Sequence, residues 1–281
     1  MISKDIVILY HGDCPDGFGG AWAAHKKFGS KAEYIPVHHQ MPPPQGLTGK
    51  EIYLIDFAYP EDVMGELLKN NQRVTAIDHH VSAEKSVKLT QDYIYDIRHS
   101  GSVLAWKYFH SDKPVPMLLS YVEDRDLWKF NVEGTREIGM YVDTFNFDFE
   151  QWDKLSEDLD SKTARKECFT KGAIMLRYEE KVIQKIIDNG ARLVDFEGYE
   201  TLVVNANGFF ASQMGEALIK RKPPIAIIWS ETKRRVSVSL RSDGSVDVSK
   251  IAAKFGGGGH KESSGFRLSD TKNFPWKDKN I

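Results

Sequence analysis

Short apolar runs alternate with helix-like segments along the first 80 residues of the chain. The runs span 6–10, 32–37, 51–57 and 73–80, and the helix-like segments span 17–29 and 61–70. Runs that are apolar at nearly every position are typical of strands buried on both faces, and intervening helices suit parallel crossovers. The pattern therefore predicts a parallel sheet covered by helices. The Pro-rich stretch 38–46 is expected to be an extended connector.

The remaining pattern predicts a connecting helix and a second α/β region. Helical composition covers 100–110 and 116–128, and the proline-free stretch 163–190 ends in Asn-Gly, a C-terminal helix signal. Strand-like and helical runs then resume at 193–196, 201–205, 209–221 and 225–229, and residues 234–241 alternate strictly between apolar and polar. We expect an α/β fold with three parts: a parallel-sheet domain (1–160), a long connecting helix (161–190) and a smaller α/β domain with a mixed sheet (191–281).

Composition narrows the class of protein. The chain has 281 residues, is 41% hydrophobic and carries a net charge of -2, so no global basic field favours long duplex nucleic acid as a partner. The two cysteines, Cys14 and Cys168, lack CxxC spacing, which argues against a disulfide framework and a thiolate zinc site. Without a signal-like segment or an 18-residue apolar run, we expect a cytoplasmic protein with no membrane partner.

Acidic and histidine residues follow three of the predicted strands. In open parallel sheets, ligands bind outside the carboxyl ends of the strands, so residues at these ends should converge. Asp124 and Asp126 end a helix-like segment and could close the same site. The residues at the strand ends are His11, Asp13 and Asp16 after the first strand, Asp56 after the third, and Asp78, His79 and His80 after the fourth.

So many carboxylates in one place require compensating charge. Without it they would repel and some would take up protons, whereas divalent cations remove the problem. A histidine and carboxylate set without thiolate favours Mn²⁺, Mg²⁺ or Fe²⁺. The number of candidates suits two ions about 3.5–4 Å apart, the arrangement used in phosphate-ester hydrolysis. Taken singly, Asp-x-x-Asp-Gly is typical of a turn, and an Asp after a strand is typical of a helix N-cap. Their joint occurrence favours the metal site.

A second candidate region lies near the end of the chain, in KFGGGGHKESSGF at 254–266. Consecutive glycines let the backbone approach a ligand closely, and successive amides can form an anion-binding nest. His260 and Lys261 add donors beside it, and Arg241 is a candidate second phosphate clamp. A flexible hairpin loop is the alternative interpretation. The Walker A pattern is absent.

In this order, HGDCPDG (11–17), Asp56, AIDHH (76–80) and EDRD (123–126) resemble the DHH phosphoesterase superfamily, and GGGGH resembles its DHH-associated C-terminal domain. The resemblance spans nearly the whole chain. Members include RecJ-like exonucleases, nanoRNases that degrade short oligonucleotides, phosphatases of adenosine bisphosphate and cyclic-dinucleotide phosphodiesterases.

The resemblance implies a role for each motif residue. Asp78 would orient the metal-bound histidine, and His80 would face the scissile phosphate. In many relatives the first two acids of the motif are two residues apart, whereas Asp13 and Asp16 are three residues apart. Within EDRD, Asp124 is chosen over Asp126 by its position in the motif alone. The implied sets are His11, Asp13 and Asp56 for one metal, Asp16, Asp56, His79 and Asp124 for the other with Asp56 bridging, and Arg241, Gly257, Gly258, Gly259 and His260 for the substrate.

The resulting hypothesis is a two-metal phosphodiesterase that hydrolyses short oligonucleotides or linear dinucleotides, such as pGpG, pApA or nanoRNA, to 5′-mononucleotides. Mn²⁺ is the favoured ion and Mg²⁺ the alternative. Rival hypotheses are a 3′-phosphoadenosine 5′-phosphate phosphatase, a soluble inorganic pyrophosphatase and a catalytically silent nucleotide-binding sensor. A homodimer is left open.

Overall fold

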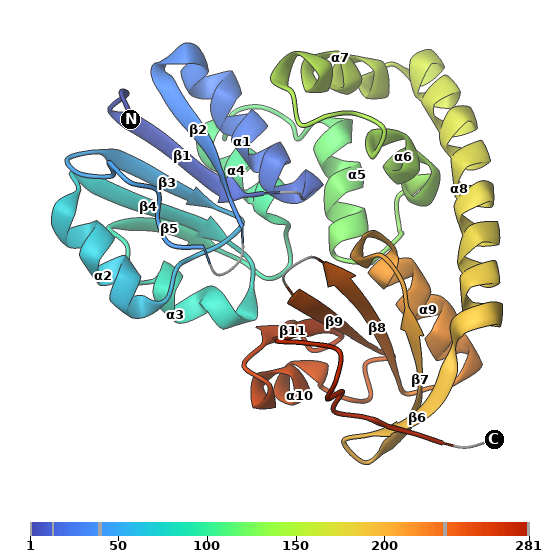
Figure 1. Ribbon diagram of the computed structural model, residues 1–281. Helices are drawn as coiled ribbons and strands as arrows, with labels where there is room; N and C mark the ends of the chain where they lie inside the picture. The colour runs from blue at the N-terminus through green and yellow to red at the C-terminus, as the bar shows by residue number, and fades with distance from the viewer. Residues whose placement is uncertain (1, 13, 39–40, 233–234, 280–281) are drawn as a thin grey trace. The chain divides into compact units, whose positions relative to one another are not determined.

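The chain forms two compact units, Met1–Leu176 and Arg177–Ile281 (Figure 1). The computed structural model describes residues 2–12, 14–38, 41–232 and 235–279. The N-terminal unit contains, in chain order, β1 (Ile6–His11), α1 (Pro15–Phe28), β2 (Ala32–Val37), β3 (Glu51–Ile55), α2 (Glu61–Asn70), β4 (Arg73–Asp78), α3 (Glu84–Val87), β5 (Asp92–Tyr95), α4 (Gly101–Phe109), α5 (Met117–Asp126), α6 (Thr135–Val142) and α7 (Phe149–Asp160).

The five strands of this unit form one parallel sheet in the order β2-β1-β3-β4-β5. Its two faces bury different side chains because successive residues of a strand point to opposite sides. Val7 and Leu9 face a core that contains Met64 of α2, and Ile8 faces the core that contains Trp22 of α1. Helices α2 and α3 lie on one side of the sheet, and α1 and α4 lie on the other (Figure 1). The predicted parallel sheet is confirmed.

The strand order has a topological switch point between β1 and β3. From β1 the chain crosses to β2 on one side and then returns to β3 on the other. In open α/β sheets, ligands bind at such a switch point, outside the carboxyl ends of the strands. His11 ends β1, Asp56 follows β3 directly and Asp78 ends β4, so the topology brings these three residues to the same edge.

One helix start differs from the sequence expectation in a way that affects the site. The sequence suggested a helix from Gly17, but α1 begins at Pro15, with Cys14 as its N-cap residue. Proline suits the first position of a helix because its ring presets φ and its missing N–H would have no intrahelical partner there. Asp16 therefore lies in the first helical turn and is almost completely buried.

Helix α8 (Lys162–Gly190) runs through the boundary between the two units, and a mixed sheet follows it. The other elements of the C-terminal unit are β6 (Arg192–Phe196), β7 (Tyr199–Asn205), α9 (Ala211–Arg221), β8 (Ile225–Thr232), β9 (Arg235–Ser242), α10 (Val248–Lys254), β10 (Gly258–Gly259), β11 (Ser263–Leu268) and β12 (Lys277–Asp278). Strands β7 and β8 are parallel, and the other neighbours are antiparallel, in the order β10-β11-β9-β8-β7-β6-β12.

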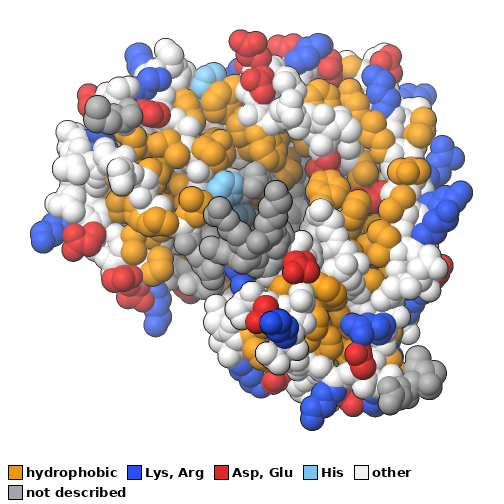
Figure 2. Space-filling model, viewed as in Figure 1, with side chains coloured by type: hydrophobic (Ala, Val, Ile, Leu, Met, Phe, Trp, Pro, Cys, Tyr) orange, Lys and Arg blue, Asp and Glu red, His pale blue; other side chains and the backbone are white. Residues whose placement is uncertain are grey.

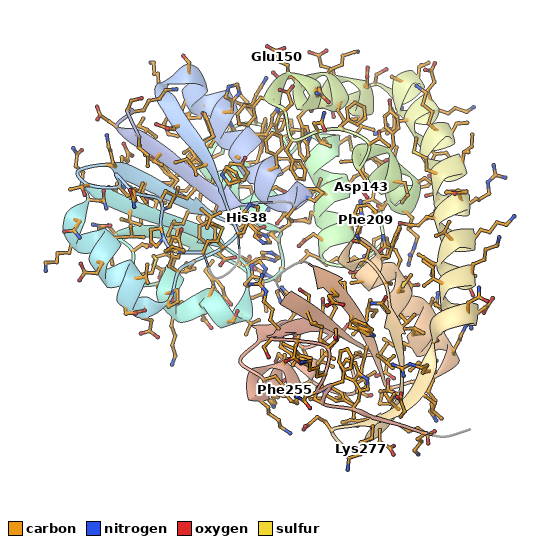
Figure 3. All side chains as sticks on the ribbon, in the orientation of Figure 1. His38, Asp143, Glu150, Phe209, Phe255 and Lys277 are labelled. Atoms are coloured by element: carbon orange, nitrogen blue, oxygen red, sulfur yellow. The ribbon has the colours of Figure 1, made fainter. Side chains whose placement is uncertain are left out.

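The alternation in 234–241 corresponds to β9, whose Val236, Val238 and Leu240 are buried in the core of the C-terminal unit. Phe255, labelled in Figure 3, stacks on Phe266 in the same core. Charged side chains of both signs are interspersed over the face shown in Figure 2. Within the described residues, no helix is long and apolar enough to cross a membrane.

Candidate active site

Three strand ends bring histidine and aspartate side chains together at the edge of the parallel sheet. Asp56 is almost completely buried, and its two carboxylate oxygens face different histidines. Oδ2 lies 3.3 Å from Nδ1 of His11, and Oδ1 lies 3.2 Å from Nε2 of His79. The backbone at Asp56 has φ 65°, a left-handed conformation that costs energy in a residue with a Cβ. Asp56 is therefore held at the centre of the cluster.

Two helices add carboxylates on the other side of His79. Asp16 lies in the first turn of α1, and Asp126 is the last residue of α5. Nε2 of His79 lies 3.8 Å from Oδ2 of Asp16 and 3.6 Å from Oδ2 of Asp126. The Asp126 side chain is 27% exposed, whereas those of His79 and Asp16 are 4% and 1% exposed. The cluster thus opens toward solvent at Asp126.

The N-terminus of α4 holds the Asp16 carboxylate. The amides of Gly101 and Ser102 donate hydrogen bonds of 2.7 and 3.0 Å to its two oxygens. Such amides carry the positive end of the helix dipole and favour an anion. A Cβ on Gly101 would lie 2.7 Å from Cβ of Asp56, so the close approach of α4 to Asp56 requires glycine at this position.

Asp78 contacts His80 rather than the imidazole of His79. Its Oδ1 lies 2.7 Å from Nδ1 of His80 and accepts backbone hydrogen bonds from the amides of His79 and His80. The resemblance had implied that Asp78 orients the metal-bound histidine. In the structure its carboxylate fixes the His80 ring and the turn of the chain after β4. The His80 side chain is 29% exposed.

The two acids of EDRD lie in different surroundings, and Asp124 is not part of the cluster. Its Oδ1 accepts a hydrogen bond from the amide of Asn131, and its Oδ2 accepts bonds from the Val132 amide and the Thr135 hydroxyl. The choice of Asp124 from motif position therefore differs from the geometry, which brings Asp126 to His79. Asp13, predicted as a ligand, lies outside the described residues.

The pKa values of the cluster show how strongly the charges interact. Burial, together with the charges of Asp56 and Asp126, raises the pKa of Asp16 well above its usual value. Burial raises the pKa of Asp126 to about 6. Burial would lower the pKa of His79, but the Asp56 carboxylate outweighs it and raises the pKa to about 9. Burial alone would raise the pKa of Asp56, but His11 and His79 hold it well below its usual range.

The donor atoms fit divalent metal ions. Two atoms bound to one ion at about 2.0–2.2 Å lie about 3–4.4 Å apart. The separations of Asp56 from His11 and His79, and of His79 from Asp16 and Asp126, all fall in this range. Among the described residues, Asp78 Oδ2 is buried without a hydrogen bond, and Asp56 Oδ1 lacks a well-aligned one. The potential ligand groups are Asp56, Asp78, His79 and His80; His11, Cys14 and Asp56; and Asp16, His79 and Asp126.

A small pocket of about 100 Å³ adjoins this cluster within the N-terminal unit. Asp16, Asp126 and Arg125 line it, together with Cys14 and apolar residues of α5 and α6. Burial and the nearby acids raise the pKa of the Cys14 thiol, which disfavours a thiolate there. The sequence did not single out Arg125 or Gly101. Two signals were available in the sequence. Arg125 is next to the candidate ligand Asp126, and Gly101 follows Ser100, which is the N-cap residue of α4.

In the C-terminal unit, Arg241 lies against helix α9. Nη2 donates a 3.0 Å hydrogen bond to the Ser212 hydroxyl, and Nη1 donates a 2.9 Å bond to the Leu240 carbonyl. Nε is buried without a hydrogen bond, and no carboxylate among the described residues forms an ion pair with this guanidinium. Burial lowers its pKa to about 10, so the side chain remains charged near neutrality. It is a partly buried cation that an anion would stabilise.

Several amides of the glycine run, where an anion-binding nest was expected, are hydrogen bonded within the fold. The amides of Gly256 and Gly257 bond to carbonyls of Ala253 and Ala252, and the His260 amide bonds to the Ser263 carbonyl. Gly258–Gly259 form strand β10 against β11. A Cβ on Gly257 would lie 2.1 Å from the carbonyl oxygen of Gly265. Close strand packing therefore explains the glycine at 257.

The fold and the cluster define a class: a two-unit α/β protein whose parallel sheet carries a cluster of histidines and carboxylates at the switch point. The family model of the DHHA1 domain matches residues 205–276. Protein R106 of Acanthamoeba polyphaga mimivirus is 32% identical over 291 residues, which cover 95% of this chain and 68% of the relative.

Solved structures share the fold at low sequence identity. A DHH domain from a member of a ribosomal protein family has a TM-score of 0.61, 11% identity and coverage of 95% of this chain and 83% of its own. The pGpG-specific phosphodiesterase PggH of Vibrio cholerae has a TM-score of 0.51, 14% identity and coverage of 95% and 94%. An exopolyphosphatase-related protein of Bacteroides fragilis has a TM-score of 0.51, 15% identity and coverage of 95% and 88%. The chain belongs to the DHH phosphoesterase superfamily.

Proposed function

We propose that this protein is a two-metal phosphodiesterase that hydrolyses short oligonucleotides or linear dinucleotides to 5′-mononucleotides. The observation that carries the proposal is the position of Asp56, whose two oxygens face His11 and His79 at 3.3 and 3.2 Å. A carboxylate shared in this way suits a bridge between two ions. The pGpG specificity of the structural neighbour PggH supports a dinucleotide substrate.

The proposed ligand sets follow the geometry. His11 and Asp56 belong to the first ion, together with Asp13 as implied by the motif. Bound divalent ions would neutralise charge on the phosphate and lower the pKa of an attacking water. Mn²⁺ is favoured and Mg²⁺ is the alternative, because the set is imidazole and carboxylate with the one nearby thiol kept neutral. The second ion takes Asp16, Asp56, His79 and Asp126, with Asp126 replacing Asp124.

His80 is proposed as the proton donor that faces the scissile phosphate. Its Nδ1 lies 2.7 Å from Asp78, which fixes the orientation of the ring. Burial would lower the pKa of His80, but Asp78 outweighs it and raises the pKa to about 10. The ring therefore carries protons on both nitrogens near neutrality, and Nε2–H can stabilise a phosphate oxygen or protonate the leaving 3′ oxygen. Asp78 acts as a positioning residue for His80.

The C-terminal part is proposed to hold the end of the substrate. Arg241 is a partly buried cation without a carboxylate partner among the described residues, which suits a phosphate. His260 is the second candidate, through its side chain, and Gly257, Gly258 and Gly259 shape the backbone beside it. In this proposal, 1–160 is the catalytic domain, 161–190 the connecting helix and 191–281 the substrate-binding domain.

The test is a substrate panel with the purified chain and Mn²⁺. It contains pGpG, pApA, a five-residue RNA, 3′-phosphoadenosine 5′-phosphate and pyrophosphate. We expect release of 5′-mononucleotides from the dinucleotides, with activity abolished in Asp56→Asn and retained in Asp112→Asn, an exposed aspartate. Turnover of the bisphosphate alone would replace the proposal with a phosphatase. Tight nucleotide binding without any turnover would replace it with a sensor.

A further inference from the structure

The loop that follows Asp126 contains two aromatic residues in an unusual backbone conformation. Trp128 has φ 54° and Phe130 has φ 51°, both in the left-handed region. Bulky residues rarely adopt this region, because the Cβ crowds the backbone, and such strain persists where the surroundings enforce it. Strained positions cluster at ligand sites, which makes this loop a candidate for a role in binding.

Asp124 enforces the conformation of the loop. Its backbone carbonyl accepts the amide of Lys129 at 2.9 Å. Its carboxylate accepts the amides of Asn131 and Val132 at 2.9 and 3.0 Å and the Thr135 hydroxyl at 2.5 Å. With a longer bond of 3.4 Å from the Phe130 amide to the same carbonyl, these hydrogen bonds to one buried residue fix the turn around Trp128. One acid of the EDRD motif thus holds two aromatic rings in place.

The result of this arrangement is an exposed indole. Trp128 is 39% exposed, whereas four other tryptophans, Trp22, Trp106, Trp152 and Trp276, are at most 7% exposed. The ring packs edge-to-face on Phe130, with centroids 4.8 Å apart. The guanidinium of Arg136 lies 3.8 Å from the Phe130 centroid and 5.7 Å from the Trp128 centroid. The indole is therefore supported from within the protein and partly open to solvent.

We propose that Trp128 is a stacking platform for a nucleobase of the substrate. The inference deepens the proposed phosphodiesterase function and rests on it. Trp128 follows Asp126 by two residues, so their Cα atoms are at most about 7 Å apart. That separation suits a nucleotide whose phosphate lies at the metal ligands and whose base lies on the indole.

The chemistry of the loop favours a nucleotide over an apolar ligand. Stacking on an aromatic side chain accepts any base, because every base has a π-face. The Arg136 guanidinium in the same aromatic cluster adds positive charge, which favours an anionic ligand. An uncharged apolar partner would gain nothing from that charge. The platform would contribute to substrate binding and leave the chemical step to the histidines and aspartates.

The test compares two substitutions of Trp128. Trp128→Asn removes the ring and suits the left-handed backbone, since Asn tolerates positive φ. Trp128→Tyr keeps a ring on the same backbone. Tyr93→Thr, on edge strand β5, removes an exposed aromatic residue of the same unit and is the matched control. Thermal unfolding and circular dichroism show whether each variant folds.

With pApA and Mn²⁺, we expect Trp128→Asn to raise KM about tenfold, within a range of about 5- to 150-fold set by base stacking on aromatic side chains. Its kcat should change less than about twofold. Trp128→Tyr should restore most of the affinity, and Tyr93→Thr should behave as wild type. A dinucleotide with an abasic site in place of each base should show no difference between wild type and Trp128→Asn.

A second measurement does not depend on turnover. A 5′-phosphorylated dinucleotide of 2-aminopurine with a non-hydrolysable linkage is titrated into the Mg²⁺-loaded protein, where stacking quenches its fluorescence. Tighter binding and stronger quenching by wild type than by Trp128→Asn support the platform. Equal affinities in the two proteins, or no quenching by wild type, overturn it. If wild type hydrolyses no member of the panel, the phosphodiesterase proposal fails, and this titration still decides the role of Trp128.

Discussion

Asp124 and Asp126 are two residues apart in α5, yet their carboxylates have different partners. Asp126 Oδ2 lies 3.6 Å from Nε2 of His79, whereas the Asp124 oxygens accept hydrogen bonds from Asn131, Val132 and Thr135. Two residues correspond to about 200° around a helix, so the two side chains cannot share one face. One acid belongs to the candidate metal site and the other holds the following loop.

This division predicts opposite phenotypes for two matched substitutions. Asp126→Asn should lower kcat about 100-fold or more and weaken Mn²⁺ binding, with the melting temperature of the metal-free protein unchanged or raised, because a carboxylate is removed from an acidic cluster. Asp124→Asn should lower the free energy of unfolding by about 1.5–3 kcal/mol, the usual value for hydrogen bonds to a charged group. Calorimetric Mn²⁺ titration and thermal melts separate the two. Equal loss of metal binding in both variants contradicts the assignment.

Gly101 offers a steric test of the same site. A Cβ there would lie 2.7 and 2.8 Å from Cβ and Oδ1 of Asp56. Gly101→Ala should therefore displace Asp56 or α4, remove most activity and lower the free energy of unfolding by about 1–3 kcal/mol, as overpacking does. Gly65→Ala is the control, since no atom lies within 4 Å of its Cβ position on α2. It should stabilise the protein by up to about 1 kcal/mol. Wild-type activity in Gly101→Ala would argue against the observed packing.

Proton release on metal binding is expected from the pKa values. With a pKa of about 9, His79 is protonated at pH 7 in the metal-free protein, and with a pKa of about 6, Asp126 gains a proton below that pH. Metals bind neutral imidazole and ionised carboxylate, so raising the pH should strengthen binding. Calorimetric Mn²⁺ titrations between about pH 6 and 8, in buffers of different ionisation enthalpy, should show at least about one proton released at pH 7, because His79 and any protonated Asp16 must both lose their protons. No net release would contradict the protonated His79.

The sequence was sufficient for the fold and for most of the residues at the sheet edge. Continuous apolar runs such as 6–10 indicate strands that are buried on both faces of the sheet. The parallel topology then brings the carboxyl ends of these strands together. The sequence could not decide between Asp124 and Asp126 as the ligand. Helix geometry shows that one of these two acids faces away from the site, but it does not show which one. No element was predicted in 129–161, although Trp152, Leu155 and Leu159 of α7 have helical spacing and are fully buried.

Two other features depend on tertiary contacts that no local pattern reports. Three amides of the region expected to form an anion nest are already paired, because α10 and β11 supply acceptors for the amides of Gly256, Gly257 and His260. The partner of Asp78 differs because the turn after β4 brings Nδ1 of His80 to its carboxylate. Both features depend on the path of the backbone over a few residues. The residue types alone do not determine that path.

Arg125 is predicted to position Asp126 through α6. Its guanidinium makes two hydrogen bonds to Asp143, which is labelled in Figure 3, and one to the Gly139 carbonyl. Arg125→Lys loses the two-pronged geometry, so Mn²⁺ affinity should fall about tenfold, in the range seen for residues that support metal ligands. Lys154→Ala, which breaks an exposed pair with Asp158, should change stability by less than about 0.5 kcal/mol and leave Mn²⁺ binding intact. Unchanged affinity in Arg125→Lys would show that α5 needs no such support.

The last prediction concerns the proposed phosphate clamp of the C-terminal unit. A Cβ at Gly215 would lie 2.3 Å from Cγ of Arg241, so Gly215→Ala should push the guanidinium away from Ser212. If Arg241 holds the substrate phosphate, Gly215→Ala and Arg241→Ala should both raise KM for pApA about tenfold or more, with kcat nearly unchanged, because the interaction is the same in the ground and transition states. Gly208→Ala, whose nearest neighbour is 3.9 Å away, is the control and should keep the wild-type KM. A large loss of kcat at constant KM in Arg241→Ala would place the residue in the chemical step instead of in substrate binding.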